Sequence, residues 1–274
     1  MTKPIHTHYT FYLMLVLMTA TACKHNSAKS TTQSKPMSQR RVSKAGCPIG
    51  DKAIVSLTYD DGLASQLSNA VPMLDERGIH ATFFLNDIGA NPAPWKAVRD
   101  AGHELASHTL AHPCTASFDW VKEGNASEDF TPKRMSKELD DQLALLQSLG
   151  ASPPYSFAYP CGTTWIGSEH TSYIPLVEQR FVAARGVGGD IITQLDVPMN
   201  VPAYFLEGPL EAFIGSANAA IAKKGWVVFG FHGVGGDYLS VSNADHGAFL
   251  DWLVAHQNEV AVLPFRDAAQ CMMP

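Results

Sequence analysis

The sequence AIVSLTYDDG, residues 53–62, joins an apolar, β-branched run to two adjacent aspartates and a glycine. Such a run predicts a buried strand that ends near Asp60 and Asp61. Adjacent carboxylates repel each other, and a turn before Gly62 needs only one Asp or Asn. The pair therefore indicates either a solvated turn or a positively charged group held at the end of this strand.

The same alternation continues along the chain. Strands are predicted at 53–59, 80–85, 103–107, 156–159, 181–184, 226–231 and 260–263. Helical spacing of apolar residues is found at 64–77, 94–101, 135–149, 209–224 and 243–257. Alternating strands and helices favour parallel strands with helices outside them, and seven or eight such units indicate a barrel. The segments 113–133 and 185–208 are interpreted as long loops, which are often functional.

Chemically active residues follow several of the predicted strands. Asp60 and Asp61 follow the first, His108 and His112 the third, and His232 the strand 226–231. Barrel active sites lie at the carboxyl ends of the strands. We therefore expect these side chains to meet at one rim of the barrel.

The segment ASHTLAHP contains His108 and His112, four residues apart. On one helical turn this spacing places both imidazoles on the same face, as in two-histidine metal sites. For the pair alone, two unrelated surface or core histidines are the preferred interpretation. Asp61 would supply a third ligand, and two histidines with a carboxylate form a common zinc set. Asp60 would then remain free to take a proton from water near the cation.

Four motifs occur in order: TYDDG (58–62), SHTLAH (107–112), FAYPCG (157–162) and FGFHG (229–233). Together they resemble the polysaccharide deacetylases of carbohydrate esterase family 4, which share the NodB homology domain. The resemblance covers roughly residues 53–265. It implies a distorted (β/α) barrel of about seven parallel strands with outer helices, and metal-dependent removal of acetyl groups from sugars.

The resemblance also implies a role for each motif residue. Asp60 would be the general base and His232 the general acid, while Asp61 and the two histidines would hold the cation. The backbone N–H of Cys161 would complete an oxyanion hole. The implied ion is usually Zn²⁺, although Co²⁺, Ni²⁺ or Mn²⁺ also suit such ligands.

Two family features are absent from the expected positions. An arginine that pairs with the base is missing before Pro160, and Arg185, at the end of the strand 181–184, could supply that charge instead. A surface location for Arg185 is the alternative. The acidic residue that orients the catalytic histidine is not evident, and Asp190 and Asp196 are both candidates.

The N-terminal segment has the pattern of an export signal. Lys3 precedes the apolar run 11–18, and small residues lead to Cys23. Residues 1–22 are predicted to be a lipoprotein-like signal peptide, with lipidation of Cys23, although ordinary cleavage nearby is an alternative. The polar segment 23–50 is predicted to be a flexible tether before a catalytic domain at 51–274.

The other cysteines indicate disulfides, because an exported chain enters an oxidising compartment. We favour Cys47–Cys271, which would tie the chain ends together. We also favour Cys114–Cys161, since each follows a proline just after a motif. Free buried thiols are the alternative. A periplasmic or cell-surface location, anchored only through Cys23, follows from these features.

The composition excludes few functions beyond nucleic-acid binding. The net charge is −6 and no basic stripe occurs, which disfavours nucleic acid. Candidate substrates are acetylated xylan, chitin-type oligosaccharides and peptidoglycan, with a slight preference for a plant-type polysaccharide. A catalytically inactive glycan-binding lipoprotein and a structural lipoprotein are the alternatives. His246 is expected to face solvent, and Phe118, Trp120 and Phe130 to form an ordinary packed loop.

Overall fold

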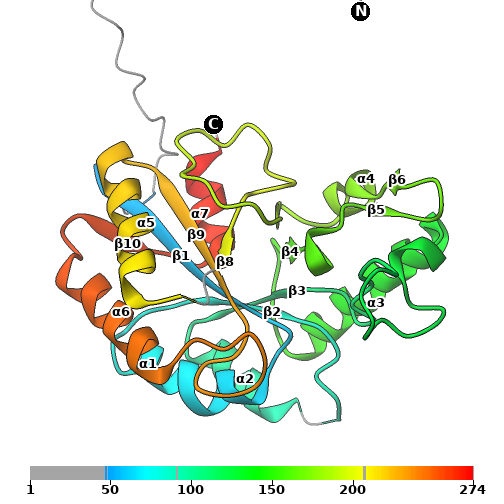
Figure 1. Ribbon diagram of the computed structural model, residues 1–274, viewed down its shortest axis with the longest axis horizontal. Coiled ribbons are helices and arrows are strands. Elements are labelled where there is room, and N and C mark those ends of the chain that lie inside the picture. The colour runs from blue at the N-terminus through cyan, green and yellow to red at the C-terminus, as the bar shows by residue number, and fades with distance from the viewer. Residues whose placement is uncertain (1–46, 48, 91, 206–207, 274) are drawn as a thin grey trace, which may run out of the picture. The chain divides into compact units, whose positions relative to one another are not determined.

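The computed structural model describes residues 47, 49–90, 92–205 and 208–273, so the predicted signal peptide, Cys23 and most of the predicted tether lie outside the described residues. The described residues form a unit built on a parallel sheet of eight strands (Figure 1). A separate antiparallel hairpin joins β5 (Trp165–Ile166) to β6 (Thr171–Ser172). No helix within these residues is long and apolar enough to cross a bilayer.

The main sheet is arranged around its first strand. Its strands are β1 (Ala53–Asp60), β2 (Thr82–Leu85), β3 (Glu104–Ser107), β4 (Ser156–Ala158), β7 (Ala183–Arg185), β8 (Tyr204–Phe205), β9 (Trp226–Phe231) and β10 (Val260–Val262). The order is β7-β4-β3-β2-β1-β9-β8. β9 pairs along one edge of β1. On the other edge, β10 pairs with the first residues of β1 and β2 pairs with its last residues. The predicted barrel of parallel strands is confirmed.

The chain between β7 and β9 connects the two ends of this sheet. Val201 forms a parallel bridge with Arg185, and its backbone N–H donates to the carbonyl of Ala184 at 2.8 Å. Tyr204 and Phe205 then pair with β9. The region 185–208, predicted to be a loop, therefore contains a short strand that curls the sheet toward a ring.

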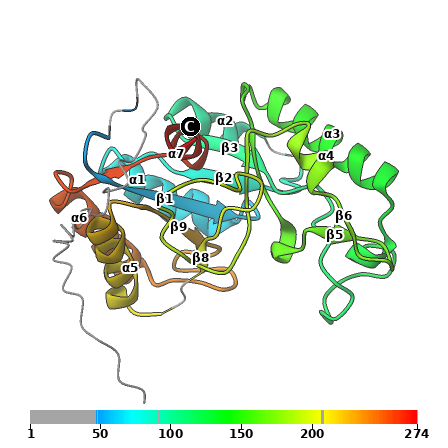
Figure 2. The same cartoon turned by 90° about the horizontal axis from the view of Figure 1, so that it is seen from above.

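Helices cover the outer face of the sheet. They are α1 (Val71–Asp75), α2 (Ala93–Asp100), α3 (Pro132–Ser148), α4 (Ile174–Glu178), α5 (Leu210–Lys223) and α6 (Asn243–Ala255), whereas α7 (Phe265–Met272) packs at one end of the barrel. Figure 2 shows α3 and α4 together to the side of β3, away from α5 and α6. Alternate residues of β1, from Ala53 to Tyr59, pack with these helices in one large apolar cluster. This burial follows from the apolar stripes that the sequence predicts for the helices.

A second apolar cluster fills the inside of the barrel. It contains Ile54, Phe84 and Val228, which lie on the inner face of three strands. Helix α7, absent from the predicted elements, packs Phe265 into this cluster. The disulfide between Cys47 and Cys271 joins the chain before β1 to α7, as predicted. The amino-terminal end of the barrel is thus closed by α7 and a covalent bond.

One prediction on the outer face was confirmed with a local change, and one was wrong. The helix expected at 64–77 is present at 64–75, with a π-helical segment, Gln66–Ala70, leading into α1. Pro72 has no N–H, so a regular α-helical ladder cannot run through it. His246 is buried rather than exposed to solvent, and its Nε2 lies 2.7 Å from the hydroxyl of Tyr59. The buried face of α6 includes His246 because that face packs on the strand that carries Tyr59.

Candidate active site

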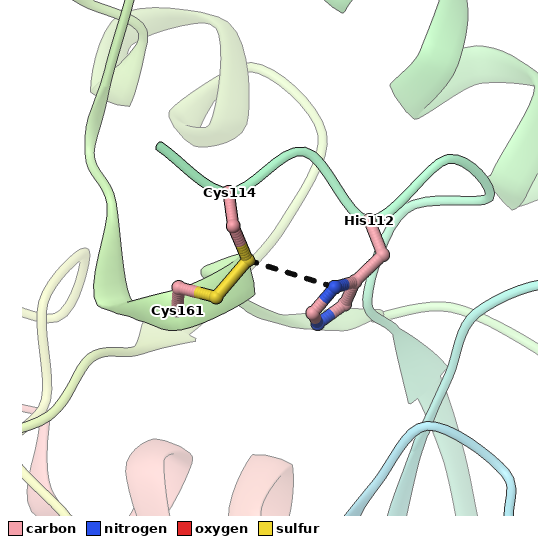
Figure 3. A group of neighbouring side chains, drawn as sticks. All are labelled: His112, Cys114 and Cys161. Carbon is pink, nitrogen blue, oxygen red and sulfur yellow. Dashed lines mark hydrogen bonds between the residues drawn. A yellow bond between two sulfur atoms is a disulfide. The ribbon is translucent and has the colours of Figure 1, made fainter. Parts of the chain in front are cut away.

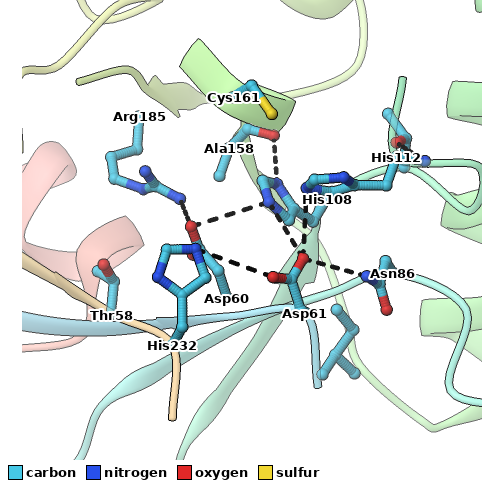
Figure 4. A network of polar contacts seen from close by, with 12 residues as sticks. Thr58, Asp60, Asp61, Asn86, His108, His112, Ala158, Cys161, Arg185 and His232 are labelled. Atoms are coloured by element: carbon cyan, nitrogen blue, oxygen red, sulfur yellow. Dashed lines mark hydrogen bonds and ion pairs between the residues drawn. The ribbon is translucent and has the colours of Figure 1, made fainter. Parts of the chain in front are cut away.

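The site lies at the carboxyl ends of the parallel strands. Asp60 is the last residue of β1, Arg185 is the last of β7, and His108 and His232 directly follow β3 and β9. Figure 4 shows these side chains pointing toward one another from their separate strands. The structure therefore brings together residues up to 172 positions apart, as the strand-end pattern predicts.

Asp60 and Asp61 both reach the same cavity although they are adjacent. Consecutive side chains of a strand point to opposite faces. Asp61 leaves the strand with a φ of 75°, and its backbone N–H donates to the carbonyl of Phe84 at 3.0 Å. As a result His108 Nε2 lies 3.8 Å from Asp60 Oδ2 and 3.7 Å from Asp61 Oδ1. The strained turn thus keeps both carboxylates beside one imidazole.

His108 and His112 meet through a loop, and the expectation of a helical turn was wrong. Thr109 and His112 have φ values of 58° and 48°, in the left-handed region, so no α-helix runs between the histidines. The loop nevertheless places the two imidazole centroids 4.8 Å apart. His112 Nε2 lies 3.3 Å from Asp61 Oδ1. The two histidines and Asp61 therefore converge without a helix.

The ligand atoms of these three residues suit a divalent cation. One atom from each of Asp61, His108 and His112 falls within a group whose members lie within 4.8 Å of one another. His108 Nδ1 donates to the carbonyl of Ala158 at 2.8 Å, which leaves its Nε2 free to ligate. Burial and the neighbouring His108 lower the pKa of His112 to about 4, so its imidazole is neutral at pH 7. A carboxylate with two imidazoles fits Zn²⁺.

Asp60 is held as an ion by Arg185. Burial would raise the pKa of Asp60, but Arg185, His108 and His232 together hold it below the ordinary value. Arg185 Nη2 donates to Asp60 Oδ2 at 2.5 Å, and both side chains are buried. Among the described residues, Asp60 Oδ1 has no hydrogen-bond partner. One carboxylate oxygen is thus paired and the other is available.

Aromatic rings enclose the guanidinium of Arg185. Its Cζ lies 5.1 Å from the ring centre of Phe84 and 4.8 Å from that of Phe205. Phe205 comes this close because Gly230 has no side chain, since a Cβ at Gly230 would lie 2.4 Å from the Phe205 ring. Arg185 is therefore part of the site and not a surface residue. The charge missing before Pro160 reaches Asp60 from the next strand of the sheet.

His232, which directly follows β9, lies beside the carboxylate pair. Its Nε2 is 3.8 Å from Asp61 Oδ2, and its ring is flanked by Phe205 and Tyr238. Asp190 accepts from the backbone of Ile191, and Asp196 from the side chain of Gln194. Neither aspartate is paired with His232 among the described residues, so the structure assigns neither of them the orienting role.

The second disulfide joins two loops of the site, as predicted. Cys114, two residues after His112, is bonded to Cys161, and its sulfur lies 3.7 Å from His112 Nδ1 (Figure 3). These sulfurs also lie close enough to His112 to suggest a metal group. Because they are bonded to each other, they cannot act as thiolate ligands. Cys161 has a φ of 52° and lines the site pocket.

Sequence reasoning missed two residues that contact Asp61. Asn86 Nδ2 donates to Asp61 Oδ1 at 3.1 Å, and the hydroxyl of Tyr238 donates to Asp61 Oδ2 at 2.8 Å. Asn86 directly follows β2, so the strand-end rule could have found it. Tyr238 lies in a glycine-rich loop, where no periodic pattern marks its direction.

All of these groups surround one pocket of about 1110 Å³. It contains the two carboxylates, the three histidines, Arg185 and Cys161, together with aromatic and apolar side chains. A cleft with an apolar lining and a few convergent polar groups is typical of an enzyme site for an organic substrate.

A comparison with known families agrees with this geometry. Residues 27–171 match the family model described as polysaccharide deacetylase, which is more than half of the chain. The chain belongs to the polysaccharide deacetylase family. The predicted relationship to carbohydrate esterase family 4 and the NodB domain is thereby confirmed.

Individual relatives in this family are similar over parts of their length. A chitin deacetylase of Colletotrichum lindemuthianum is 34% identical over 93 residues, which cover 30% of this chain and 37% of that protein. A peptidoglycan-N-acetylglucosamine deacetylase of Bacillus cereus is 28% identical over 146 residues, covering 52% of this chain and 50% of that protein. The alignments thus span half or less of these two relatives.

The fold has a counterpart among solved structures. A candidate polysaccharide deacetylase from Mycobacterium smegmatis superposes with a TM-score of 0.59 at 16% identity, covering 84% of this chain and 93% of that chain. At this identity the likeness concerns the polysaccharide deacetylase fold alone.

Proposed function

We propose that this protein is a metal-dependent carbohydrate deacetylase that hydrolyses acetyl groups from a glycan. The observation that carries the proposal is the pocket in which Asp61, His108 and His112 converge beside the Asp60–Arg185 pair and His232. A divalent ion bound there would polarise the acyl carbonyl and lower the pKa of a water molecule. Zn²⁺ is the first candidate, with Co²⁺, Ni²⁺ and Mn²⁺ as alternatives.

The residues of the chain divide the proton transfers between them. Asp60 takes a proton from the attacking water through Oδ1, which is free of hydrogen bonds within the described residues. Arg185 holds the other oxygen and keeps the carboxylate ionised before the substrate arrives. His232, beside Asp61, donates a proton to the departing oxygen or nitrogen. The backbone N–H of Cys161 would stabilise the oxyanion that forms during hydrolysis.

The named relatives influence the choice of substrate. Those reported above are a chitin deacetylase and a peptidoglycan-N-acetylglucosamine deacetylase. They move our first choice from acetylated xylan to glycans that contain N-acetylglucosamine. Acetylated xylan stays in the test as the ester alternative.

We also propose that the chain is exported, with residues 1–22 removed, Cys23 lipidated and residues 23–50 serving as a tether before the catalytic domain. The residue pattern before Cys23 and the two disulfides support this location. Mass spectrometry of the membrane fraction should find a diacylglyceryl group on Cys23, and Cys23→Ala should release the protein in soluble form. A soluble, unmodified wild-type protein would contradict the anchor.

The decisive experiment for the activity is acetate release from chito-oligosaccharides, acetylated xylan and peptidoglycan, before and after chelation. Release should stop on chelation and return with Zn²⁺. Asp60→Asn should keep the metal but lose about 10²- to 10⁴-fold in rate, the range for removal of a general base.

A catalytically inactive glycan-binding protein is the alternative. It is less well supported because the base, the acid and the ligand set all lie in one pocket. If the protein binds Zn²⁺ and oligosaccharide but releases no acetate from any substrate, the alternative replaces our proposal.

A further inference from the structure

Two exposed aromatic rings extend outward from the metal-binding histidines. Phe118 and Trp120, in the loop between β3 and α3, are 42% and 58% exposed. Their ring centroids lie 5.4 Å apart in a stacked arrangement, and Trp120 lies 6.1 Å from the ring of His112. The expected packed loop is therefore only partly present, because Phe130 is buried whereas the other two rings face solvent.

The loop that carries these rings is firmly attached. The disulfide of Cys114 with Cys161 fixes its start. The N–H of Ser127 donates to the carbonyl of Cys114 at 2.8 Å, and its hydroxyl donates to the carbonyl of Pro113 at 3.1 Å. Such contacts hold the loop in one place while Phe118 and Trp120 stay exposed to solvent. Exposed neighbouring apolar groups on a fixed loop are a feature of binding surfaces.

Further apolar side chains line the same pocket. Tyr238 and Leu239, in the loop after His232, are 52% and 49% exposed, and Val187 follows β7. The pocket that these residues share with Phe118 and Trp120 has a volume of about 1110 Å³. An acetyl group alone needs only a small part of it. The cleft has room for sugar rings beyond the one that carries the acetyl group.

The charges in the pocket restrict the kind of sugar. Among the described residues that line it, Arg185 is the only lysine or arginine, and it is buried and paired with Asp60. Asp60 and Asp61 supply negative charge at the centre, which Arg185 and the proposed divalent ion would balance. A sugar carboxylate at the aromatic part of the cleft would therefore lose its hydration without meeting an available arginine or lysine, which disfavours binding. An uncharged ring meets no such penalty.

We propose that Phe118 and Trp120 form a saccharide shelf, a subsite that holds an uncharged pyranose ring next to the sugar being deacetylated. The C–H face of a pyranose can lie flat on an aromatic ring, and large rigid rings provide contact area at a low entropic cost. The inference rests on the proposed function, because that function places the reacting sugar beside His112. It adds that the substrate is a neutral oligosaccharide, recognised over more than one residue.

The test separates binding from catalysis. In an Asp60→Asn background, in which turnover is slowed, the affinity for N-acetylchitopentaose is measured by calorimetry. Trp120→Ala should weaken binding about tenfold, equivalent to about 1.4 kcal/mol, and Phe118→Ala should weaken it less. Trp120→Phe should recover most of the affinity, because it keeps a ring on the shelf. Val197→Thr is the matched surface control, since Val197 is 60% exposed and does not line the pocket.

Two further readouts address length and charge. In the otherwise native enzyme, Trp120→Ala should reduce the ratio of kcat/KM for the pentamer to that for the dimer, mainly through a higher KM. Penta-galacturonate, which is anionic, should bind at least tenfold more weakly than the neutral pentamer.

The outcomes distinguish the inference from the function on which it rests. Binding that depends on Trp120 without any acetate release would support the shelf and overturn the deacetylase activity. Acetate release with unchanged pentamer affinity in Trp120→Ala would overturn the shelf alone. Equal affinities for penta-galacturonate and the neutral pentamer would also overturn the shelf. So would a Trp120→Ala variant that changes only the self-association measured by sedimentation.

Discussion

The two ends of the barrel each hold a buried carboxylate inside the ring of strands, and the two carboxylates are stabilised in opposite ways. Asp60, the last residue of β1, is paired with Arg185 and its pKa is held below the ordinary value. Glu104, the first residue of β3, has its pKa raised by burial, which outweighs the nearby Arg266 and its hydrogen bonds. Pairing thus lowers the pKa of the carboxyl group at one end of the barrel, and burial raises the pKa of the carboxyl group at the other.

The neighbours of each carboxylate explain this difference. Glu104 accepts from the hydroxyls of Thr82 and Ser156 and from the backbone N–H of Arg266, at the start of α7. These hydrogen bonds connect β2, β3, β4 and α7 to one another. Asp60 has a full positive charge at one oxygen and an unpaired second oxygen. A buried carboxylate is thus available for chemistry where an opposite charge is paired with it but one of its oxygens has no hydrogen bond.

The largest effect is expected from removing the positive charge that pairs with Asp60 at the carboxyl end of the barrel. Arg185→Met leaves Asp60 buried without its arginine, and breaking such a pair costs about 3–5 kcal/mol of unfolding free energy. Urea denaturation of the chelated protein measures the loss. The double variant Asp60→Asn/Arg185→Met should lose less than the single one, because no unpaired charge remains. Equal stability of Arg185→Met and wild type would contradict the buried pair.

One disulfide lies at each end of the barrel, so removing them one at a time tests the same difference between the two ends. Cys47→Ser/Cys271→Ser, at the base, should lower the unfolding free energy by about 2–5 kcal/mol while kcat stays unchanged at a permissive temperature. Cys114→Ser/Cys161→Ser should cost stability and also activity, because it frees the loops that carry His112 and the shelf. Denaturation and acetate release are compared for the two double variants. If Cys47→Ser/Cys271→Ser lost as much activity as Cys114→Ser/Cys161→Ser, the two disulfides would not differ in their effect on the site.

A smaller effect is expected where Tyr238 contacts Asp61. Tyr238→Phe removes the hydrogen bond to Asp61 Oδ2, and outer contacts of metal ligands are worth about 10- to 100-fold in affinity. Competition with a zinc chelator measures the change. Tyr204→Phe is the control, because Tyr204 lines the same pocket and has no hydrogen bond to Asp61 among the described contacts. Equal zinc affinities of the two variants would assign Tyr238 no part in holding the ligand.

The smallest effect concerns Glu104 and appears only as a pH dependence. Its folded pKa is raised, so the folded state binds more protons than the unfolded state between the unfolded and folded pKa values. Wild-type stability should therefore fall as pH rises through that window, by at most about 1.4 kcal/mol per pH unit. Glu104→Gln should remove this fall, whereas Glu259→Gln, at an exposed position, should keep it. Parallel pH profiles of unfolding for wild type and Glu104→Gln would contradict the assignment.

Much of the site could be predicted because the sequence shows where apolar strands end and which polar residues follow them. The apolar runs locate the strands, so Asp60, His108 and Arg185 could be placed at one rim, and the cysteine pairs could be matched by their positions. The conformation of the loop between His108 and His112 could not be predicted. Two of its residues adopt positive φ, a choice made by tertiary contacts and not by local propensity.

Other features escaped prediction for related reasons. Periodicity shows which residues of a helix share a face, but α7 is a short helix that closes an end of the barrel, outside the alternating pattern. His246 is polar, so its place on the buried face of α6 was not expected. For Phe118 and Trp120, composition does not distinguish a packed ring from a displayed one. The missing information in each case is which surface another element already occupies.

The short segment that curls the sheet has a consequence for the order of maturation. Val201 bridges to Arg185, and Phe205 lies against the guanidinium, so the arginine is oriented only once the seam between β7 and β9 is sealed. Asp61, His108 and His112 come from β1 and β3, which do not border that seam. Under the proposed roles, a chain whose seam is still open would bring its three metal ligands together before Arg185 is oriented against Asp60, and hydrolytic activity would appear last.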